Sequence, residues 1–199
     1  PTLQPGEEGI IAVEIENNLE EDAKDISFIL NLQNIPFTPV GSSEESIEEI
    51  EEDDEEEFLF RIKAANDIAP GDYQIPYTFS FKIENQQQTR QGAMGVTVKA
   101  DSELTFSLST EKPILNQQDK ITLKIINKGF ADAKFLTVKL IQDKTGYTLL
   151  SEDEVYIGTV DSDDFETAVF DVIYKNQEPI FSAIVEYRDF ENNKKTESI

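Results

Sequence analysis

The chain has 199 residues, with 41 Asp or Glu against 17 Lys or Arg, so its formal net charge at pH 7 is −24. Nucleic acids and anionic membrane surfaces are polyanions, so this charge argues against both as partners and favours cations or basic proteins. His, Cys and Trp are absent, which excludes imidazole catalysis, cysteine nucleophiles, disulfides and metal sites built from His or Cys. Only oxygen-ligated metals such as Ca²⁺ or Mg²⁺ fit this composition.

Apolar and polar residues alternate with a period of two in the first half of the chain, and no window shows a helical period. This pattern predicts strands over residues 8–17, 24–32, 46–51, 57–63, 73–82 and 89–99. Turns rich in Asn, Asp, Gly and Pro are expected at residues 17–22, 52–54 and 70–72. A polar hairpin loop is expected at residues 84–88. Pro36 and Pro39 exclude a central strand around Phe37 and favour an edge strand or crossover.

The second half follows the same plan. It predicts strands over residues 104–109, 120–127, 134–142, 155–159, 166–174 and 180–188, and a last strand after the turn at 191–193 that Ile199 cuts short. About seven short strands per half are typical of an immunoglobulin-like sandwich. We therefore expect an all-β protein of two tandem immunoglobulin-like β-sandwich domains, residues 1–100 and 101–199, linked at Ala100-Asp101.

The two halves repeat each other at a fixed offset of 110 positions, so that Asn17 returns as Asn127 and Asp22-Ala23-Lys24 as Asp132-Ala133-Lys134. The apolar residues that recur are Ile11, Val13, Ile15, Ile26, Phe28, Leu30, Ile47, Ile50, Phe60 and Ile62. Repeats of this length are whole domains rather than solenoid units. A catalytic site is not normally built from two copies in series, so we expect no enzymatic activity.

Turn and strand motifs throughout the chain point to one kind of protein. They are Pro5–Gly9 with Asn17-Asn18 and Asp22-Ala23-Lys24, Pro36–Ser43, Ala69–Tyr73, Val155–Asp164 and Tyr187-Arg188-Asp189. Together they resemble the tandem immunoglobulin-like repeats of archaeal S-layer-domain-like surface proteins and of the cell-adhesion-related (CARDB) group. The resemblance implies an extracellular or cell-surface location, no enzymatic activity and no transferable functional residues. It also implies that any membrane attachment lies in an anchor outside this segment.

An acidic run is the sharpest local feature, because 11 of the 14 residues from Glu44 to Glu57 are Asp or Glu. It would serve as a cation site or as a docking surface for a basic partner. The alternative, which we prefer, is a solvated hairpin whose charges keep an edge strand from pairing with neighbouring molecules. Ile47 and Ile50 keep the register of Ile157 and Val160, so the run belongs to the fold.

Calcium is the one cofactor that the sequence suggests. Asp161, Asp163 and Asp164 place three carboxylates within four residues, and Asp53 and Asp54 recur in the first copy. Carboxylates at this density are able to ligate Ca²⁺. The same residues are the ordinary ones of a tight turn, which is the reading that we favour.

Two other groups of residues have plain structural explanations. Arg188 beside Asp189, with Glu191 nearby, predicts a local ion pair. The aromatic residues on one face of a single predicted strand predict core packing rather than a sugar platform. They are Tyr73, Tyr77, Phe79 and Phe81.

These observations predict a non-enzymatic structural or adhesion module of a prokaryotic, archaeal-type surface protein, which acts as a spacer or assembly unit. Its partners would be other proteins or further copies at the cell surface. The alternatives are a glycan- or protein-binding module and the extracytoplasmic accessory domain of a membrane exporter. The chain begins at Pro1 and ends at Ile199 within a predicted strand, so we expect it to be a piece of a longer protein.

Overall fold

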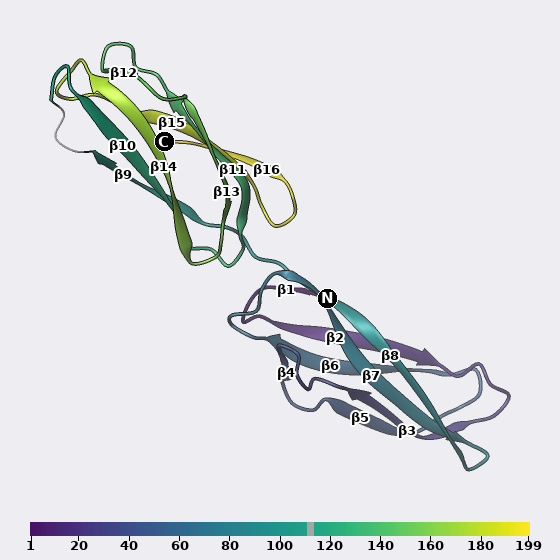
Figure 1. The fold of residues 1–199 in the computed structure, drawn as a ribbon. Helices are drawn as coiled ribbons and strands as arrows, with labels where there is room; N and C mark the ends of the chain where they lie inside the picture. Colours follow the sequence, from purple (N-terminus) through teal and green to yellow (C-terminus); the bar gives the residue numbers. More distant parts are fainter. Residues whose placement is uncertain (111–113) are drawn as a thin grey trace. The chain divides into compact units, whose positions relative to one another are not determined.

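A computed structural model describes residues 1–110 and 114–199 of the chain. Contacts divide it into two units, which we call module 1 (Pro1–Lys99) and module 2 (Ala100–Ile199). The described residues form only strands, turns and loops, which confirms the predicted all-β fold of two immunoglobulin-like β-sandwiches (Figure 1). Among these residues, no helix has the length and apolarity needed to cross a bilayer.

Module 1 consists of two sheets that face each other. Its strands are β1 (Thr2–Leu3), β2 (Glu8–Glu16), β3 (Ala23–Leu30), β4 (Phe37–Pro39), β5 (Glu44–Ile50), β6 (Glu55–Ala64), β7 (Gly71–Ile83) and β8 (Gln86–Val98). One sheet has the order β1-β8-β7-β3-β5, and the other has the order β2-β6-β4. All pairs are antiparallel except β1 with β8, which is parallel.

Module 2 also consists of two sheets. Its strands are β9 (Leu104–Thr110), β10 (Gln118–Asn127), β11 (Ala133–Ile141), β12 (Tyr147–Leu149), β13 (Glu154–Val160), β14 (Asp164–Tyr174), β15 (Ser182–Arg188) and β16 (Lys194–Ser198). One sheet has the order β12-β14-β10-β9, and the other has the order β13-β11-β15-β16. Thus β10, β14 and β11 take the places that β2, β6 and β3 hold in module 1.

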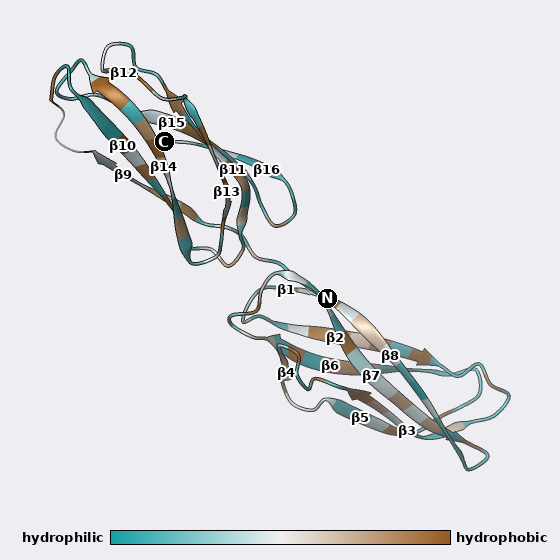
Figure 2. Ribbon diagram, in the orientation of Figure 1, coloured by the Kyte–Doolittle hydropathy of each residue, from teal (hydrophilic) through white to brown (hydrophobic). Residues whose placement is uncertain are grey.

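The period of two places apolar residues between the sheets in both modules, as the alternating colours along the strands in Figure 2 show. In module 1 the core centres on Phe28, whose ring lies 5.6 Å from that of Phe58 and 5.5 Å from that of Phe60. In module 2 the equivalent core includes Val138 and Phe170, both fully buried. Each sandwich therefore has its own core within its own residues.

The predicted strands match the observed ones to within a few residues, with three differences. The expected loop at 84–88 is only a two-residue turn, because Glu84 and Asn85 both have positive φ (48° and 64°), as a tight hairpin turn requires. Residues 86–88 belong to β8. The short strands β1 and β12 were not predicted. The expected edge position of Phe37 is confirmed, since β4 ends its sheet.

Candidate functional site

The two modules differ in the pairing of one strand, which is β2 in module 1 and β10 in module 2. In module 2, β10 lies between β14 and β9, so both of its edges are paired. In module 1, β2 pairs with β6 alone and ends its sheet. Module 1 is described completely, and within it no strand takes the place of β9. We call the unpaired side of β2 the open edge.

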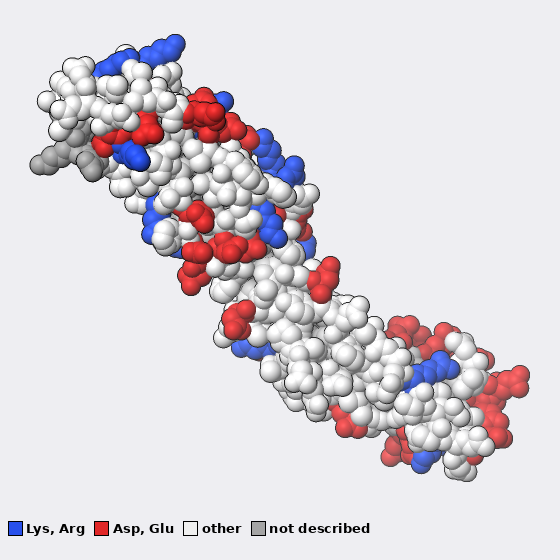
Figure 3. Space-filling view, viewed as in Figure 1, with Lys and Arg blue, Asp and Glu red and all other residues white. Residues whose placement is uncertain are grey.

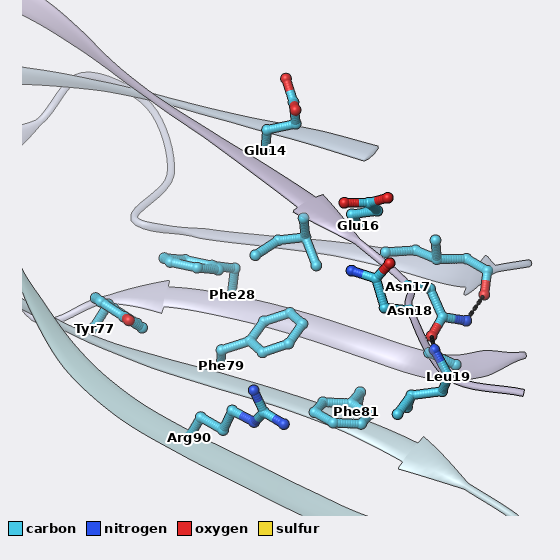
Figure 4. Close-up of a pocket in the computed structure, with 13 residues that line it drawn as sticks. Glu14, Glu16, Asn17, Asn18, Leu19, Phe28, Tyr77, Phe79, Phe81 and Arg90 are labelled. Atoms are coloured by element: carbon cyan, nitrogen blue, oxygen red, sulfur yellow. Dashed lines mark hydrogen bonds between the residues drawn. The ribbon is translucent and has the colours of Figure 1, made fainter. Parts of the chain in front are cut away.

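A pocket of about 440 Å³ lies along the open edge (Figure 4). We call it the edge pocket. Its lining is Glu14, Ile15, Glu16, Asn17, Asn18, Leu19, Ala23, Phe28, Ile50, Tyr77, Phe79, Phe81 and Arg90. The residues come from β2 and the turn after it, and from the facing sheet formed by β3, β5, β7 and β8. The pocket is therefore the space between the two sheets on the side where β2 has no neighbour.

Aromatic rings form the floor of the edge pocket. The ring of Phe28 stacks on that of Tyr77 at 5.0 Å and contacts that of Phe79 at 5.8 Å. Phe81 follows Phe79 at 5.3 Å, and the Arg90 guanidinium carbon lies 6.0 Å from the centre of the Phe81 ring. At this distance the cation interacts weakly with the ring face. The floor thus combines apolar surface with one positive charge.

The buried side chain of Asn17 forms the wall at one end of the edge pocket. Its Nδ2 donates hydrogen bonds to the carbonyl oxygens of Glu21 (2.9 Å), Ile50 (3.0 Å) and Glu51 (3.2 Å). Its Oδ1 accepts one hydrogen bond, from Leu19 N at 3.2 Å. The side chain is 5% exposed, so it ties the turn after β2 to the end of β5 and shapes the pocket wall.

Negative charge surrounds this end of module 1. The side chains of Glu14 and Glu16 are exposed on β2 at the rim of the edge pocket. Figure 3 shows acidic side chains gathered at the end of module 1 that carries the turn after β2. There, desolvation together with the nearby carboxylate of Glu84 raises the pKa of Glu21. The field at the open edge is therefore one that attracts cationic groups.

The five aspartates suggested as calcium ligands lie in two equivalent hairpin turns. Asp53 and Asp163 have positive φ (59° and 57°), as the turn requires. Asp54 Oδ1 accepts a hydrogen bond from Glu55 N at 2.9 Å, and Asp164 Oδ1 does the same for Phe165 N at 2.7 Å.

Asp161 closes the turn of module 2 through its carbonyl oxygen, which accepts from Asp164 N at 3.3 Å. Across residues 1–110 and 114–199, no three carboxylates converge on one position that would hold a metal ion. The aspartates thus act here as turn residues, and calcium binding stays a prediction.

The acidic run from Glu44 to Glu57 forms β5, a turn and the start of β6. Strand β5 ends its sheet, as expected for charges that protect an edge. Some of these carboxylates have partners: Glu49 pairs with Lys24 at 2.9 Å, and Glu45 Oε2 accepts from Leu59 N at 3.0 Å. The run is thus an ordered part of the sandwich.

The predicted partnership of Arg188 with Asp189 is replaced by another. Asp189 pairs with Lys195 at 3.2 Å and accepts from Asn193 N at 2.8 Å, whereas Arg188 Nη1 donates to the Asn192 carbonyl oxygen at 2.7 Å. Burial opposes ionisation of Asp189, yet the bonds from Asn193 and Lys195 leave its pKa below the usual value. The hairpin folds the chain back so that Lys195, rather than the sequence neighbour, reaches the carboxylate.

The edge pocket was not predicted from the sequence, although part of its floor was predicted to be core. Tyr77, Phe79 and Phe81 do pack on the core, but they also line the pocket. The available signal was in the repeat. At an offset of 110, the positions equivalent to residues 104–109 lie before Pro1, so the given residues hold no repeat of that strand.

No protein-family model matches the chain, and no curated protein has a significantly similar sequence. Among solved structures, a protein of unknown function from Porphyromonas gingivalis W83 is 10% identical, with a TM-score of 0.38 over 100% of this chain and 92% of that chain.

Two chaperones are comparably distant. The CupB2 chaperone of Pseudomonas aeruginosa is 9% identical, with a TM-score of 0.31 over 99% of this chain and 94% of that one. The YadV chaperone is 10% identical, with a TM-score of 0.32 over 100% and 94%. TM-scores this low support no argument about function or partner. The class of the protein therefore follows from its own strands: two immunoglobulin-like β-sandwiches in series, one of them open at its first edge.

Proposed function

We propose that this chain is a non-enzymatic structural or adhesion module of an extracellular, archaeal-type cell-surface protein, which acts as a spacer or assembly unit. The observation that carries the proposal is that the chain consists of two β-sandwich units, each with a core of its own.

The location is tested on intact cells of the source organism. Antibodies raised against the 199-residue chain are expected to label unbroken cells, and external protease is expected to remove the label. Labelling that appears only after lysis would refute a surface role. An abundant cytoplasmic protein, probed in parallel, checks that the cells are intact.

The mode of assembly is tested by sedimentation velocity over a range of protein concentrations, once with EDTA and once with millimolar Ca²⁺. Growth into larger species would identify a self-assembling unit. Growth only with Ca²⁺ would give the turns at Asp53 and Asp163 a bridging role. A monomer under every condition removes self-assembly and leaves interaction with a different protein.

A glycan-binding module is a second candidate, favoured by the rings of Phe79 and Phe81 and by Arg90 along the edge pocket. A pocket with aromatic surface and a few polar groups is the usual form of a small-ligand site. The two functions are separated by NMR titration with a panel of neutral and acidic disaccharides. Saturable shifts at Phe79 and Arg90 would favour the glycan, and their absence would favour the protein partner.

A further inference from the structure

The outward face of one sheet in module 2 carries three cations side by side. Lys134 on β11 lies directly opposite Arg188 on β15, and Arg188 lies directly opposite Lys194 on β16. Neighbouring strands are about 5 Å apart, so these three residues span about 10 Å of the sheet. Like charges directly opposite each other destabilise a strand pair. We call the three residues the cation row, and the stability of the sheet does not explain it.

Module 1 has a similar pair of cations, but there carboxylates neutralise both. Lys24 on β3 lies opposite Lys82 on β7, in the same pairing of strands as the first two residues of the cation row. Lys24 pairs with Glu49 at 2.9 Å, and Lys82 pairs with Asp25 at 2.8 Å. Each of these two cations thus has a carboxylate within ion-pair distance.

Module 2 retains the two cations but not the two carboxylates. At the offset of 110, Phe135 stands at the position of Asp25, and Thr159 stands at the position of Glu49. An aromatic ring and a hydroxyl group have therefore replaced the groups that neutralise the cations in module 1.

The observed partners of the cation row do not make up for this loss. Lys134 lies 3.9 Å from Asp132, a distance at which an exposed pair contributes little. Arg188 Nη1 donates to a neutral backbone carbonyl oxygen at 2.7 Å. Lys194 has a close carboxylate, that of Glu186 at 2.9 Å. The row therefore keeps positive charge that an anion would neutralise.

Phe135, next to the cation row, has an unusual backbone conformation. Its φ is +54°, in the left-handed region where bulky side chains are rare. Asp25, the equivalent residue of module 1, has a φ of +49°, and Asp adopts this region more readily. The Phe135 side chain is 60% exposed, so burial does not offset the strain. A strained residue that the core does not need indicates a role in binding.

A β-bulge places the Phe135 ring on the same face as the cations. Consecutive residues of a regular strand point to opposite faces. Here the register shifts between Lys134 and Thr137, so β11 has one extra residue. Lys134 and Phe135 are both exposed, between the buried Ala133 and Leu136. Both therefore point outward.

A second exposed ring lies on the neighbouring strand. Tyr156 on β13 is 65% exposed and lies opposite Thr137, two residues along β11 from Phe135. Its ring lies 3.9 Å from where a Cβ on Gly158 would be, so it leans along β13 toward the bulge. The equivalent of Tyr156 in module 1 is Ser46. The exposed rings are thus a feature of module 2, as is the loss of the carboxylates.

This combination of groups selects a class of ligand. Exposed aromatic rings favour flat apolar surfaces, such as the C–H face of a pyranose ring. Lys and Arg favour carboxylates, which they hold through charge-assisted hydrogen bonds. A sugar acid presents both features on one ring. Thr137 and Thr159, which lie on the same strands, add hydroxyl groups for hydrogen bonds to the sugar.

An acidic protein segment fits this face less well. The acidic run of a second copy would have to approach against the net charge of −24 on each chain. The apolar side chains of that run, Ile47 and Ile50, pack on the core of module 1 and are not free to cover the rings. A sugar acid satisfies the rings and the cations together.

We propose that the outward face of β11, β13, β15 and β16 binds an acidic glycan. A carboxylate of the glycan lies at Lys134 and Arg188, and its sugar rings lie on Phe135 and Tyr156. This site is in module 2 and is separate from the edge pocket. It adds a ligand to the spacer or assembly role and does not rest on that role.

Two trisaccharides test the proposal against the full 199-residue chain. The first is tri-galacturonate, and the second is its methyl ester, which keeps the sugar rings and lacks the charge. NMR titration with the acid is expected to give saturable shifts at the amides of Phe135, Tyr156 and Arg188. The Kd of the ester is expected to be at least about tenfold higher. Shifts at Phe79 and Arg90 instead would place the glycan in the edge pocket and overturn the proposal.

Removal of single cations supplies a matched test. Arg188→Gln and Lys134→Gln are each expected to raise the Kd of tri-galacturonate about fivefold and to leave that of the ester unchanged. Lys175→Gln removes the same charge at another exposed position of module 2, and it should change neither Kd. An equal effect of all three variants would show that net charge alone acts, which would overturn the proposal.

Phe135→Asn separates binding from folding. Asn adopts the left-handed region more readily than Phe, so the urea midpoint of module 2 should rise in this variant. The Kd of tri-galacturonate should rise as well, by about tenfold, because one ring is lost. Phe165→Asn removes a 49% exposed ring from β14 in the other sheet and should leave the affinity unchanged.

Three results would overturn the proposal: no saturable binding of tri-galacturonate, equal Kd values for the acid and the ester, or unchanged affinity in Phe135→Asn. An acidic peptide with the sequence Glu51–Glu57 covers the other occupant. If it shifts the same amides with a lower Kd than tri-galacturonate, an acidic protein segment is the ligand and the glycan is excluded. All these readouts use the purified chain, so their failure is distinguishable from a failure to label intact cells.

Discussion

Asn127 Oδ1 accepts two hydrogen bonds, from Gly129 N and from Glu103 N, both at 3.1 Å, whereas its equivalent Asn17 accepts only the one from Leu19 N. The missing donor is the residue that leads into the first strand of module 2. Asn127 therefore accepts a second hydrogen bond where β10 pairs with β9, whereas Asn17 accepts only one where β2 pairs with β6 alone. Four expected outcomes follow from this contrast and from its surroundings.

The first concerns hydrogen exchange along β2. The amides of Ala12, Glu14 and Glu16 point to the open edge and should exchange at least about tenfold faster than those of Thr122, Lys124 and Ile126, since β9 covers the latter. NMR-detected exchange on the whole chain measures both sets at once. The amides of Ile11, Val13 and Ile15 face β6 and serve as slow controls on the same strand. Equal protection of the two sets would contradict an open edge.

The second concerns the buried asparagines. Asn127→Ala removes donors to Ala131 O and Val160 O and leaves buried polar groups unpaired, so we expect module 2 to lose about 2–4 kcal/mol of unfolding free energy. Asn17→Ala should destabilise module 1 by a similar amount, because Asn17 also makes four hydrogen bonds, three donated and one accepted. Urea unfolding followed by NMR separates the two modules. The exposed Asn18 provides the control, and Asn18→Ala should be nearly neutral.

The third concerns the residue that differs most between the equivalent turns. Gly129→Leu introduces the side chain that module 1 carries at Leu19, and it collides with the backbone around Ser102. We expect a loss of about 1–3 kcal/mol from overpacking and faster exchange at Lys124 as β9 detaches. The reciprocal change, Leu19→Gly, lies at a 43% exposed side chain and should leave module 1 folded. Unchanged exchange in Gly129→Leu would show that the path of β9 is not constrained there.

The fourth concerns alkaline pH. Burial, and then the hydrogen bond from Tyr187 OH to Glu197 Oε1 at 2.9 Å, raises the pKa of Tyr187 to about 12. The folded state holds this proton more tightly than the unfolded one, so the stabilisation is complete below pH about 10 and is lost as pH rises to about 12.

The measurement is the urea midpoint of module 2 across that interval. Tyr187→Phe should reduce its decline. A smaller decline should persist in the variant, because burial also raises the pKa of Tyr147 and Tyr174. An identical decline with and without the Tyr187 hydroxyl would show that this proton does not contribute.

Strand positions were predictable because alternation depends only on the sequence itself. Ile11, Val13 and Ile15 alternate with polar or small residues, and the repeat at Ile121 supports the same register. Short strands such as β12 (Tyr147–Leu149) were not predictable, since three residues are too few to show a period. Their pairing comes from the strand beside them.

The open edge depends on which strands meet, and this lies beyond local pattern. Strand β1 pairs with β8 rather than with β2, and nothing in Thr2 or Leu3 reveals that choice. The residues in the two equivalent turns did differ in a way that bears on this pairing. Gly129 has no Cβ, so the backbone around Ser102 can pass close to it, whereas module 1 has the larger Leu19 at the equivalent position. Asp53 and Asp163 fitted both a turn and a calcium site, because turns and metal sites use the same side chains. The turns are observed, and calcium binding stays a prediction.

The parallel pairing of β1 with β8 determines how module 1 resists stretching. Thr2 and Leu3 run parallel to the end of β8, where Thr97 N donates to Pro1 O at 3.1 Å and Lys99 N donates to Leu3 O at 2.8 Å. A pull that separates Pro1 from Lys99 slides the two segments past each other and strains both bonds at once, rather than one after the other. Stretching force thus falls on β1 and β8 rather than on β2.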